Sequence, residues 1–192
     1  MQKDALILSA ASAYYNAAIL ALNMVGADPK AQTVQSWEMM LPYIMNAAFS
    51  CELALKSLLT NPPKDHKLDA LLECLRLEEM ADNNGADPTA DPDSHYNYLL
   101  QQAFDNWRHT QGKHYKDMDS TDKADFLKQL NINSSDFVDV RYIHEGGLKL
   151  HEYKPGLLLA ITEAILEDNH YEKSVRTGFM ERHRAAEELK VP

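Results

Sequence analysis

Residues 46–59 read Asn46-Ala47-Ala48-Phe49-Ser50-Cys51-Glu52-Leu53-Ala54-Leu55-Lys56-Ser57-Leu58-Leu59. From Ile44 onward, apolar side chains alternate steps of four and three residues, at Ile44, Ala48, Cys51, Leu55 and Leu58. This spacing places them on one face of an α-helix. Asn61-Pro62-Pro63 ends that helix, and Pro42 marks either its first turn or a kink after residues 37–40. The sequence therefore predicts a core helix here.

The rest of the chain repeats helical patterns. An N-terminal segment has the spacing of one helix face until Gly26 and Asp28-Pro29 stop it, at Leu6, Ala10, Ala13, Ala17, Leu20 and Met24. Further helices are expected at 65–80, 96–107, 120–130, 136–145, 155–169 and 171–190. Residues 82–94 are rich in Asp, Asn, Pro and Gly and predict an exposed loop. No segment has the period-two alternation of strands, so the fold class is all-α.

Length and charge restrict the classes of protein. A chain of 192 residues with 45% hydrophobic residues fits one domain. Its 29 acidic and 19 basic residues give a net charge of -10, which repels phosphate backbones and anionic membranes. A nucleic-acid site must therefore be a local basic patch.

Cysteine usage and the N-terminus bear on location. Cys51 and Cys74 fall within apolar helical patterns, which favours buried thiols in a reducing cytoplasm over a disulfide or metal site. Ala11-Ser12-Ala13 imitates a signal cleavage site, but the helical pattern continues through it to Met24. No uninterrupted run of about 18 apolar residues occurs, so no membrane span is expected.

Glu52 is a carboxylate at the edge of the apolar face of the predicted core helix. Lys56, four residues later, can pair with it in the favourable order. Alternatively, Glu52 faces a groove and supports a polar site.

Arg141 and His144 are three residues apart, so a helix would place both on one face. Arginine can hold phosphate as a fixed fork, and histidine can transfer protons near neutral pH. Equally, Arg141 can pair with a carboxylate such as Glu52 while His144 caps a helix. Both interpretations stay open.

Metal and cofactor chemistry is disfavoured by the spacing of the candidate ligands. His144-Glu145 and His151-Glu152 lack the His-Glu-x-x-His spacing, and Gly146-Gly147 interrupts a helix between them. Asp82-Asn83-Asn84-Gly85 does not match a calcium loop. No phosphate-binding glycine loop, nucleophile elbow or Cys-x-x-Cys occurs. We therefore expect no metal and no cofactor.

Residues 46–59, followed by Lys64-Asp65-His66-Lys67-Leu68, resemble the second helix and the His-x-Leu turn of HEPN domains. Residues 137–145 and the start of the helix at Gly156-Leu157-Leu158 resemble later segments of that family. The resemblance covers about residues 5–170. It implies a four- to five-helix up-and-down bundle at 1–170 with an insertion at about 82–115, and a C-terminal helical extension at 171–192.

The resemblance also implies a homodimer, and in many members metal-independent RNA cleavage within toxin-antitoxin or antiviral systems. Cleaving members carry Arg, four to six residues, then His, with an acidic residue on the second helix that corresponds to Glu52. Arg141 and His144 are too close for that hallmark. Two other pairs have the spacing, at Arg108 and His114 and at Arg176 and His183, but chance alone gives about one match.

Two functions are therefore expected as alternatives. The first is an RNA-binding protein or metal-independent endoribonuclease with Glu52, Arg141 and His144 at its site, whose partners are RNA or a cognate antitoxin-like protein. The second is a catalytically inactive interaction or nucleotide-binding module in which these residues only connect helices. The net acidity and the departure from the hallmark favour the second, and the polar residues expected against the core helix favour the first.

Overall fold

The computed structural model describes residues 2–26, 34–64, 66–108, 126, 128 and 155–168. These residues form five α-helices and a short 3-10 helix, in the order α1 (Gln2–Gly26), α2 (Val34–Leu58), α3 (Leu68–Asp82), η1 (Pro88–Ala90), α4 (His95–Arg108) and α7 (Pro155–Asp168). No strand occurs within the described ranges. The predicted all-α fold is confirmed.

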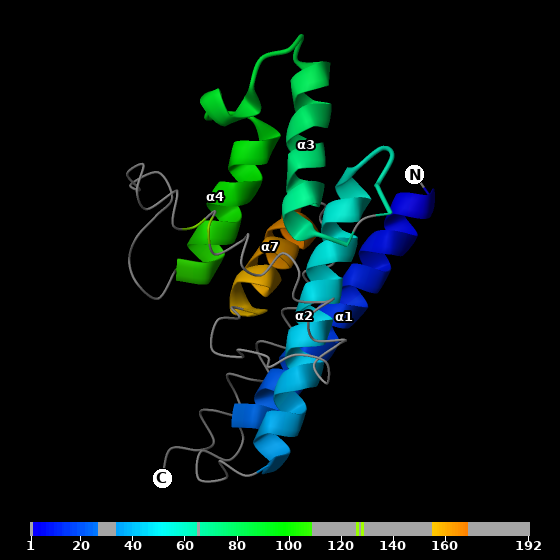
Figure 1. The fold of residues 1–192 in the computed structure, drawn as a ribbon, viewed down its shortest axis with the longest axis vertical. Coiled ribbons are helices and arrows are strands. Elements are labelled where there is room, and N and C mark those ends of the chain that lie inside the picture. Colours follow the sequence, from blue (N-terminus) through cyan, green and yellow to red (C-terminus); the bar gives the residue numbers. More distant parts are fainter. Residues whose placement is uncertain are drawn as a thin grey trace.

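The long helices α1 and α2 lie side by side in opposite directions and make the most extensive contact between any two elements (Figure 1). Helix α7 packs against both α2 and α4, and α3 and α4 lie together at the upper end of the view. Most of α7 is buried, from Pro155 to Ile165. The core therefore lies between α1, α2, α4 and α7, and α1 contacts both α2 and α7.

Helix α2 confirms the helix predicted around residues 46–59 and buries Ala47, Cys51 and Leu55. It starts at Val34, so a first-turn position for Pro42 is wrong. A proline inside a helix lacks one backbone N–H donor and leaves one carbonyl without its helical partner. The helix nevertheless continues through Pro42, and it packs against α1 and α7.

Helix α1 forms where expected, but the face with the regular spacing is not the face that it buries. Buried positions are Leu8, Ala11, Ala18 and Ala21. Leu6, Leu20 and Met24 are 74%, 55% and 64% exposed. Because apolar residues occur on more than one side of α1, spacing alone does not select the buried side. Small alanines on the buried side allow α2 to approach closely, and the Ser50 hydroxyl of α2 donates a hydrogen bond of 2.9 Å to the Ala11 carbonyl.

Within the described part of the chain, one segment, Ala5–Met24 of α1, is long and apolar enough to cross a membrane. Core helices of soluble proteins and signal sequences meet the same criterion. The absence of a membrane span stays a prediction.

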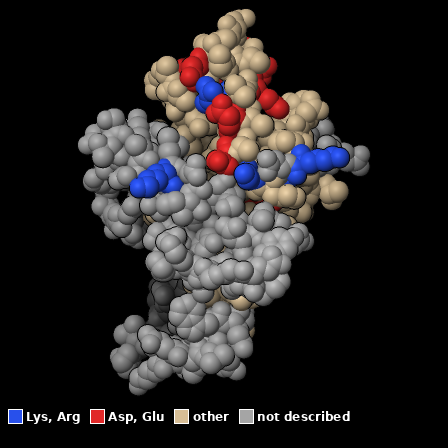
Figure 2. Space-filling model, in the orientation of Figure 1, with Lys and Arg blue, Asp and Glu red and all other residues tan. Residues whose placement is uncertain are grey.

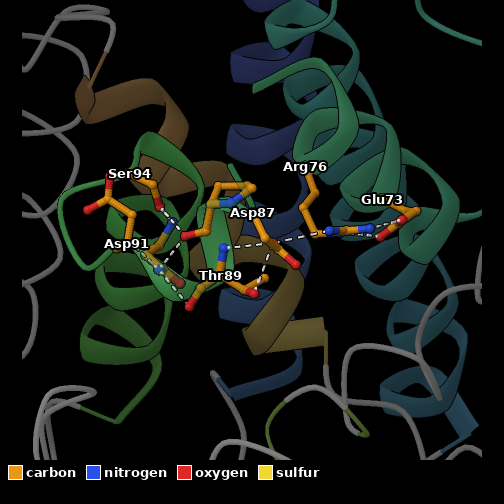
Figure 3. Close-up of polar contacts among 8 residues, drawn as sticks. Glu73, Arg76, Asp87, Thr89, Asp91 and Ser94 are labelled. Carbon is orange, nitrogen blue, oxygen red and sulfur yellow. Dashed lines mark hydrogen bonds and ion pairs between the residues drawn. The ribbon is translucent and has the colours of Figure 1, made fainter. Parts of the chain in front are cut away.

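The connection from α3 to α4 is an exposed acidic loop, as expected, but it is fastened to α3. Arg76 of α3 donates hydrogen bonds to both carboxylate oxygens of Glu73 and lies 3.1 Å from Asp87 in the loop (Figure 3). Asp87 in turn accepts hydrogen bonds from the backbone N–H of Thr89, at 3.0 Å, and from its hydroxyl, at 2.9 Å. These bonds hold the start of η1.

The N-terminus of α4 is capped by a side chain from α3. The two carboxylate oxygens of Glu79 accept the backbone N–H groups of His95, at 2.7 Å, and Tyr96, at 2.8 Å. Ser94 adds a cap, since its hydroxyl accepts the N–H of Asn97 at 3.1 Å. A carboxylate at a helix N-terminus is stabilised by the helix dipole. Helices α3 and α4 are thereby joined by polar contacts as well as by packing.

Several sequence expectations concern other parts of the chain. Phe126, expected on an apolar helix face, is helical and buried, and its ring lies 5.3 Å from that of Phe104. Helix α3 begins at Leu68, and Lys67 is its N-cap residue. Most of the helix expected at 120–130 lies outside the described residues, as do those expected at 136–145 and 171–190.

Candidate functional site

Glu52 is the centre of a polar cluster at the C-terminal part of α2. The residue is only 4% exposed. Its Oε1 atom accepts hydrogen bonds from Lys56 Nζ, at 2.8 Å, and lies 2.9 Å from His66 Nδ1. Its Oε2 atom is buried and has no hydrogen-bond partner in the described part of the structure. A single buried carboxylate oxygen therefore joins one helix to the turn that follows it.

The turn at residues 59–67, named here the α2–α3 turn, follows from the sequence. Helix α2 ends at Leu58, and Pro62-Pro63 cannot continue it because proline lacks the backbone donor. Leu59 and Leu68, at the two ends, are each 3% exposed and anchor the turn in the core. In addition, the backbone N–H of Thr60 donates to a Glu78 carboxylate oxygen of α3 at 3.0 Å. Because the chain reverses direction in this turn, His66 lies next to Glu52.

His66 is the most accessible member of this cluster. Its side chain is 53% exposed, whereas the side chain of Lys56 is 15% exposed. A neutral imidazole that donates its Nδ1–H to a carboxylate has its basic nitrogen at Nε2. Carboxylates that fix a histidine in this way orient it for proton transfer in many enzymes. The geometry can therefore support general acid–base chemistry at the molecular surface.

The α2–α3 turn is a local basic segment in an acidic protein. From Lys56 to Lys67 the chain has three lysines and one histidine against one acidic residue, Asp65. Lys64 and Lys67 are exposed. Acidic side chains gather instead over the end formed by α3 and the loop after it, with lysine and arginine side chains beside them (Figure 2). The turn thus meets the requirement that an acidic chain can hold phosphates only at a local basic patch.

A second histidine–carboxylate pair lies far along the chain from the first. His95 Nε2, at the start of α4, is 3.0 Å from Asp168 Oδ2, at the end of α7. Both side chains are partly exposed, and no lysine adjoins either residue in sequence. This pair joins two helix ends and serves as a comparison for the Glu52–His66 contact.

No group of three or more His, Cys, Asp or Glu side chains within the described ranges is arranged to hold a metal ion. The two cysteines are free thiols, Cys51 buried and Cys74 half-buried. The Glu52 cluster supplies one carboxylate and one imidazole, and its ammonium group repels cations. These groups are suited to proton transfer and to binding an anion.

Of the predicted site residues, Glu52 is placed at the edge of the core as expected, and the expected pair with Lys56 is present. Arg108 is the last residue of α4, and nothing in the described part of the structure places its side chain. The other candidates lie outside the described residues, namely Arg141, His144, His114, Arg176 and His183. Whether they approach Glu52 stays a prediction.

His66 was not among the predicted site residues. Helical spacing relates residues three or four apart, whereas Glu52 and His66 are fourteen apart and meet through a turn. The signal available in the sequence is the Pro62-Pro63 pair, which shows that the chain must turn before His66. The proline pair does not show that the turn leads the chain back towards Glu52.

Comparison with models of protein families, with curated proteins and with solved structures finds no match to this chain.

Proposed function

We propose that this chain is a HEPN-like helical protein that binds RNA at the α2–α3 turn and cleaves it without a metal ion. The observation that carries the proposal is the contact of 2.9 Å between His66 and the buried carboxylate of Glu52, in a turn that also presents Lys64 and Lys67. The remaining roles come from the resemblance to HEPN domains. Arg141 and His144 are expected to join this site.

The chemistry that fits these groups is attack of a ribose 2′-oxygen on the adjacent phosphorus. A base takes the proton from the 2′-hydroxyl, cations stabilise the negative charge that develops on the phosphate oxygens, and the 5′-oxygen leaves with a proton. His66, oriented by Glu52, is the proposed base. The ammonium groups of the turn and the guanidinium of Arg141 are the proposed cations, and His144 is the proposed acid.

The charge distribution supports RNA rather than a neutral ligand. A net charge of -10 opposes contact of most of the surface with a polyanion, so binding has to be restricted to a basic segment. The α2–α3 turn is such a segment, and it adjoins the only buried carboxylate among the described side chains. Restriction of this kind also limits the number of phosphates that can be bound.

We also propose that the protein is a cytoplasmic homodimer and that it belongs to a toxin-antitoxin or antiviral system with a cognate antitoxin-like partner. These parts of the proposal come from the resemblance to HEPN domains. The second candidate is an inactive interaction module. The Glu52–Lys56 hydrogen bond of 2.8 Å favours this second candidate, because a carboxylate that already pairs with a lysine of its own helix can be a purely structural residue.

The test uses the purified full chain, EDTA and labelled single-stranded RNAs of mixed sequence. We expect products with 2′,3′-cyclic phosphate ends. Lys64→Gln with Lys67→Gln should reduce the slope of log affinity against log salt by about 1.4, because each phosphate contact contributes about 0.7 on single strands. The exposed Lys128 lies outside the turn, so Lys128→Gln is the control.

Absence of both binding and cleavage on all RNAs overturns the proposal. Binding without cleavage overturns the catalytic part and favours the inactive module. An equal change of slope for the turn variant and for Lys128→Gln contradicts the α2–α3 turn as the binding surface.

A further inference from the structure

The turn that follows α3 contains Asn84-Gly85, the only Asn-Gly dipeptide in the chain. Both residues are exposed. Asn84 has a φ of 56° and Gly85 has a φ of 85°, so both adopt the left-handed backbone conformation that asparagine and glycine tolerate better than other residues. The end of α3 therefore presents a side-chain amide to water, directly before a residue that has no side chain.

An asparagine in this position can lose its amide group without an enzyme, and asparagine is for this reason a thermolabile residue. The backbone nitrogen of Gly85 attacks Cγ of Asn84, and the new C–N bond closes a cyclic succinimide. The side-chain nitrogen leaves as ammonia and takes up the proton of the backbone N–H. Water then adds to one of the two ring carbonyls and breaks one ring C–N bond, which gives aspartate or isoaspartate.

The space around Gly85 is open to this reaction. A Cβ placed on Gly85 would have no atom of the described residues within 4 Å. Asn97 shows the opposite situation, because its amide nitrogen donates to the backbone carbonyls of Asp91, at 2.6 Å, and of Pro88, at 2.8 Å. The amide of Asn97 is therefore held in place, whereas that of Asn84 extends from an exposed turn.

One hydrogen bond opposes the attack in the folded protein. The backbone N–H of Gly85 donates to the carbonyl of Met80 at 2.9 Å and closes the last turn of α3. The nitrogen must lose this proton before it can attack, and a carbonyl acceptor holds the proton in place. The reaction therefore requires that the last turn of α3 opens, and the ends of helices are among the parts of a fold that open most readily.

An ion pair fastens the same turn from the other side. Asp87, three residues after Asn84, lies 3.1 Å from Arg76 of α3 (Figure 3). This contact ties the loop back to the helix, so it opposes opening of the last turn. Because the side chain of Asp87 is 48% exposed, the contribution of the pair is modest.

We propose that Asn84 is a site of spontaneous deamidation, at a rate that is set by opening of the last turn of α3 and slowed by the Arg76–Asp87 ion pair. The product adds a negative charge at the C-terminal end of a helix, where the helix dipole disfavours it. The last turn of α3 has no basic residue to offset this charge. Deamidation should therefore loosen the turn further. This inference does not depend on the proposed RNA chemistry.

The experiment incubates the purified full chain at mildly alkaline pH and follows Asn84 by proteolytic digestion and mass spectrometry. Aspartate and isoaspartate products should accumulate at Asn84, at least about fivefold more slowly than in the same chain unfolded in guanidinium chloride, because the folded turn is mostly closed. Asn84→Gly should give no product at this position, and its glycine accepts the positive φ.

Asp87→Ala should raise the rate in the folded chain about two- to fivefold, the factor by which loss of an exposed ion pair shifts a local opening equilibrium. Asp93→Ala is the matched control, since Asp93 is an exposed carboxylate of the same loop, and it should keep the wild-type rate. In guanidinium chloride all three chains should react equally fast. Hydrogen exchange measures the consequence, because Asn84→Asp should lower the protection of the Gly85 amide.

A folded chain that gives no product at Asn84 overturns the proposal. Equal rates in the folded and unfolded chains contradict the restraint by the last turn of α3. Equal rates for Asp87→Ala and Asp93→Ala contradict the role of the ion pair, and unchanged protection in Asn84→Asp contradicts the loosening of the turn.

Discussion

His66 Nδ1 lies 2.9 Å from Glu52 Oε1, although the two residues are fourteen positions apart and belong to a turn and a helix. The carboxylate is buried, whereas the imidazole is half exposed. The buried carboxylate of Glu52 therefore holds the solvent-accessible imidazole of His66 in place. The proposed RNA chemistry depends on this pair.

Glu52→Ala should lower the free energy of unfolding by about 2 kcal/mol, because it removes the acceptor of two hydrogen bonds to titratable side chains. Urea denaturation followed by circular dichroism measures the loss. Glu73→Ala is the control, since Glu73 also pairs with a cation on its own helix but is 51% exposed, and it should cost less than about 1 kcal/mol. Equal losses of unfolding free energy in the two variants would show that burial of the Glu52 carboxylate does not add to the stability of the protein.

The Arg76 cluster predicts a dependence of stability on acid pH. Hydrogen bonding by Arg76 lowers the pKa of Glu73, and hydrogen bonding by the backbone and hydroxyl of Thr89 lowers the pKa of Asp87. Carboxyl groups with lowered pKa values stabilise the fold above their ordinary values near 4, and this contribution is lost as the pH falls through the lowered values. The loop at residues 83–94 should therefore loosen below about pH 4.

Carboxyl NMR titration separates the two causes. Arg76→Gln should raise the pKa of Glu73 more than that of Asp87, because Thr89 still holds Asp87. An Arg76→Gln variant in which the pKa of Asp87 rises as much as that of Glu73 would contradict these assigned causes. So would a wild type in which neither pKa is lowered.

Tyr43 should titrate at very alkaline pH. It is buried in α2, and its burial raises the pKa of the phenol to about 12. The neutral form is the one that the folded protein accommodates, so the stabilisation is complete below about pH 10 and is lost as the pH rises towards 12. Absorbance at the tyrosinate band should show a late step that Tyr43→Phe removes. A wild type without that late step would contradict the burial of this hydroxyl.

Arg141 and His144 are predicted to act with Glu52 on RNA. Arg141→Ala and His144→Ala should each lower the rate of RNA cleavage in EDTA at least about 100-fold while leaving the urea midpoint in place. His114→Ala and His183→Ala should have little effect, because their spacing from Arg108 and Arg176 is explained by chance. Unfolding of Arg141→Ala would instead support a purely structural ion pair.

Helices could be predicted from the sequence where helical apolar spacing was bounded by proline residues. Residues 46–59 followed by Asn61-Pro62-Pro63 gave both a helix and its end, and Pro155 gave the first residue of α7. Helix α1 shows where spacing fails. With apolar residues on more than one side, its buried face is selected by close packing of alanines against α2, and that depends on the shape of a neighbour that the local sequence does not contain.

The candidate site was predictable only as far as local geometry reaches. Lys56 is one helical turn from Glu52, so their pair follows from spacing. The contact with His66 depends on the path of the α2–α3 turn, which is set by the burial of Leu59 and Leu68 in a core assembled from distant helices. Contacts that depend on such long-range packing are not encoded in any short motif.

The measurement that tests the central claim most directly compares two histidine variants in single-turnover cleavage of RNA in EDTA. His66 and His95 both lie about 3 Å from a carboxylate, but only His66 adjoins the lysines of the α2–α3 turn. His66→Gln should lower the cleavage rate by roughly 10²- to 10⁴-fold with RNA affinity nearly unchanged, and His95→Gln should keep the wild-type rate. Equal rates for the two variants would contradict a role for the Glu52–His66 pair in RNA chemistry.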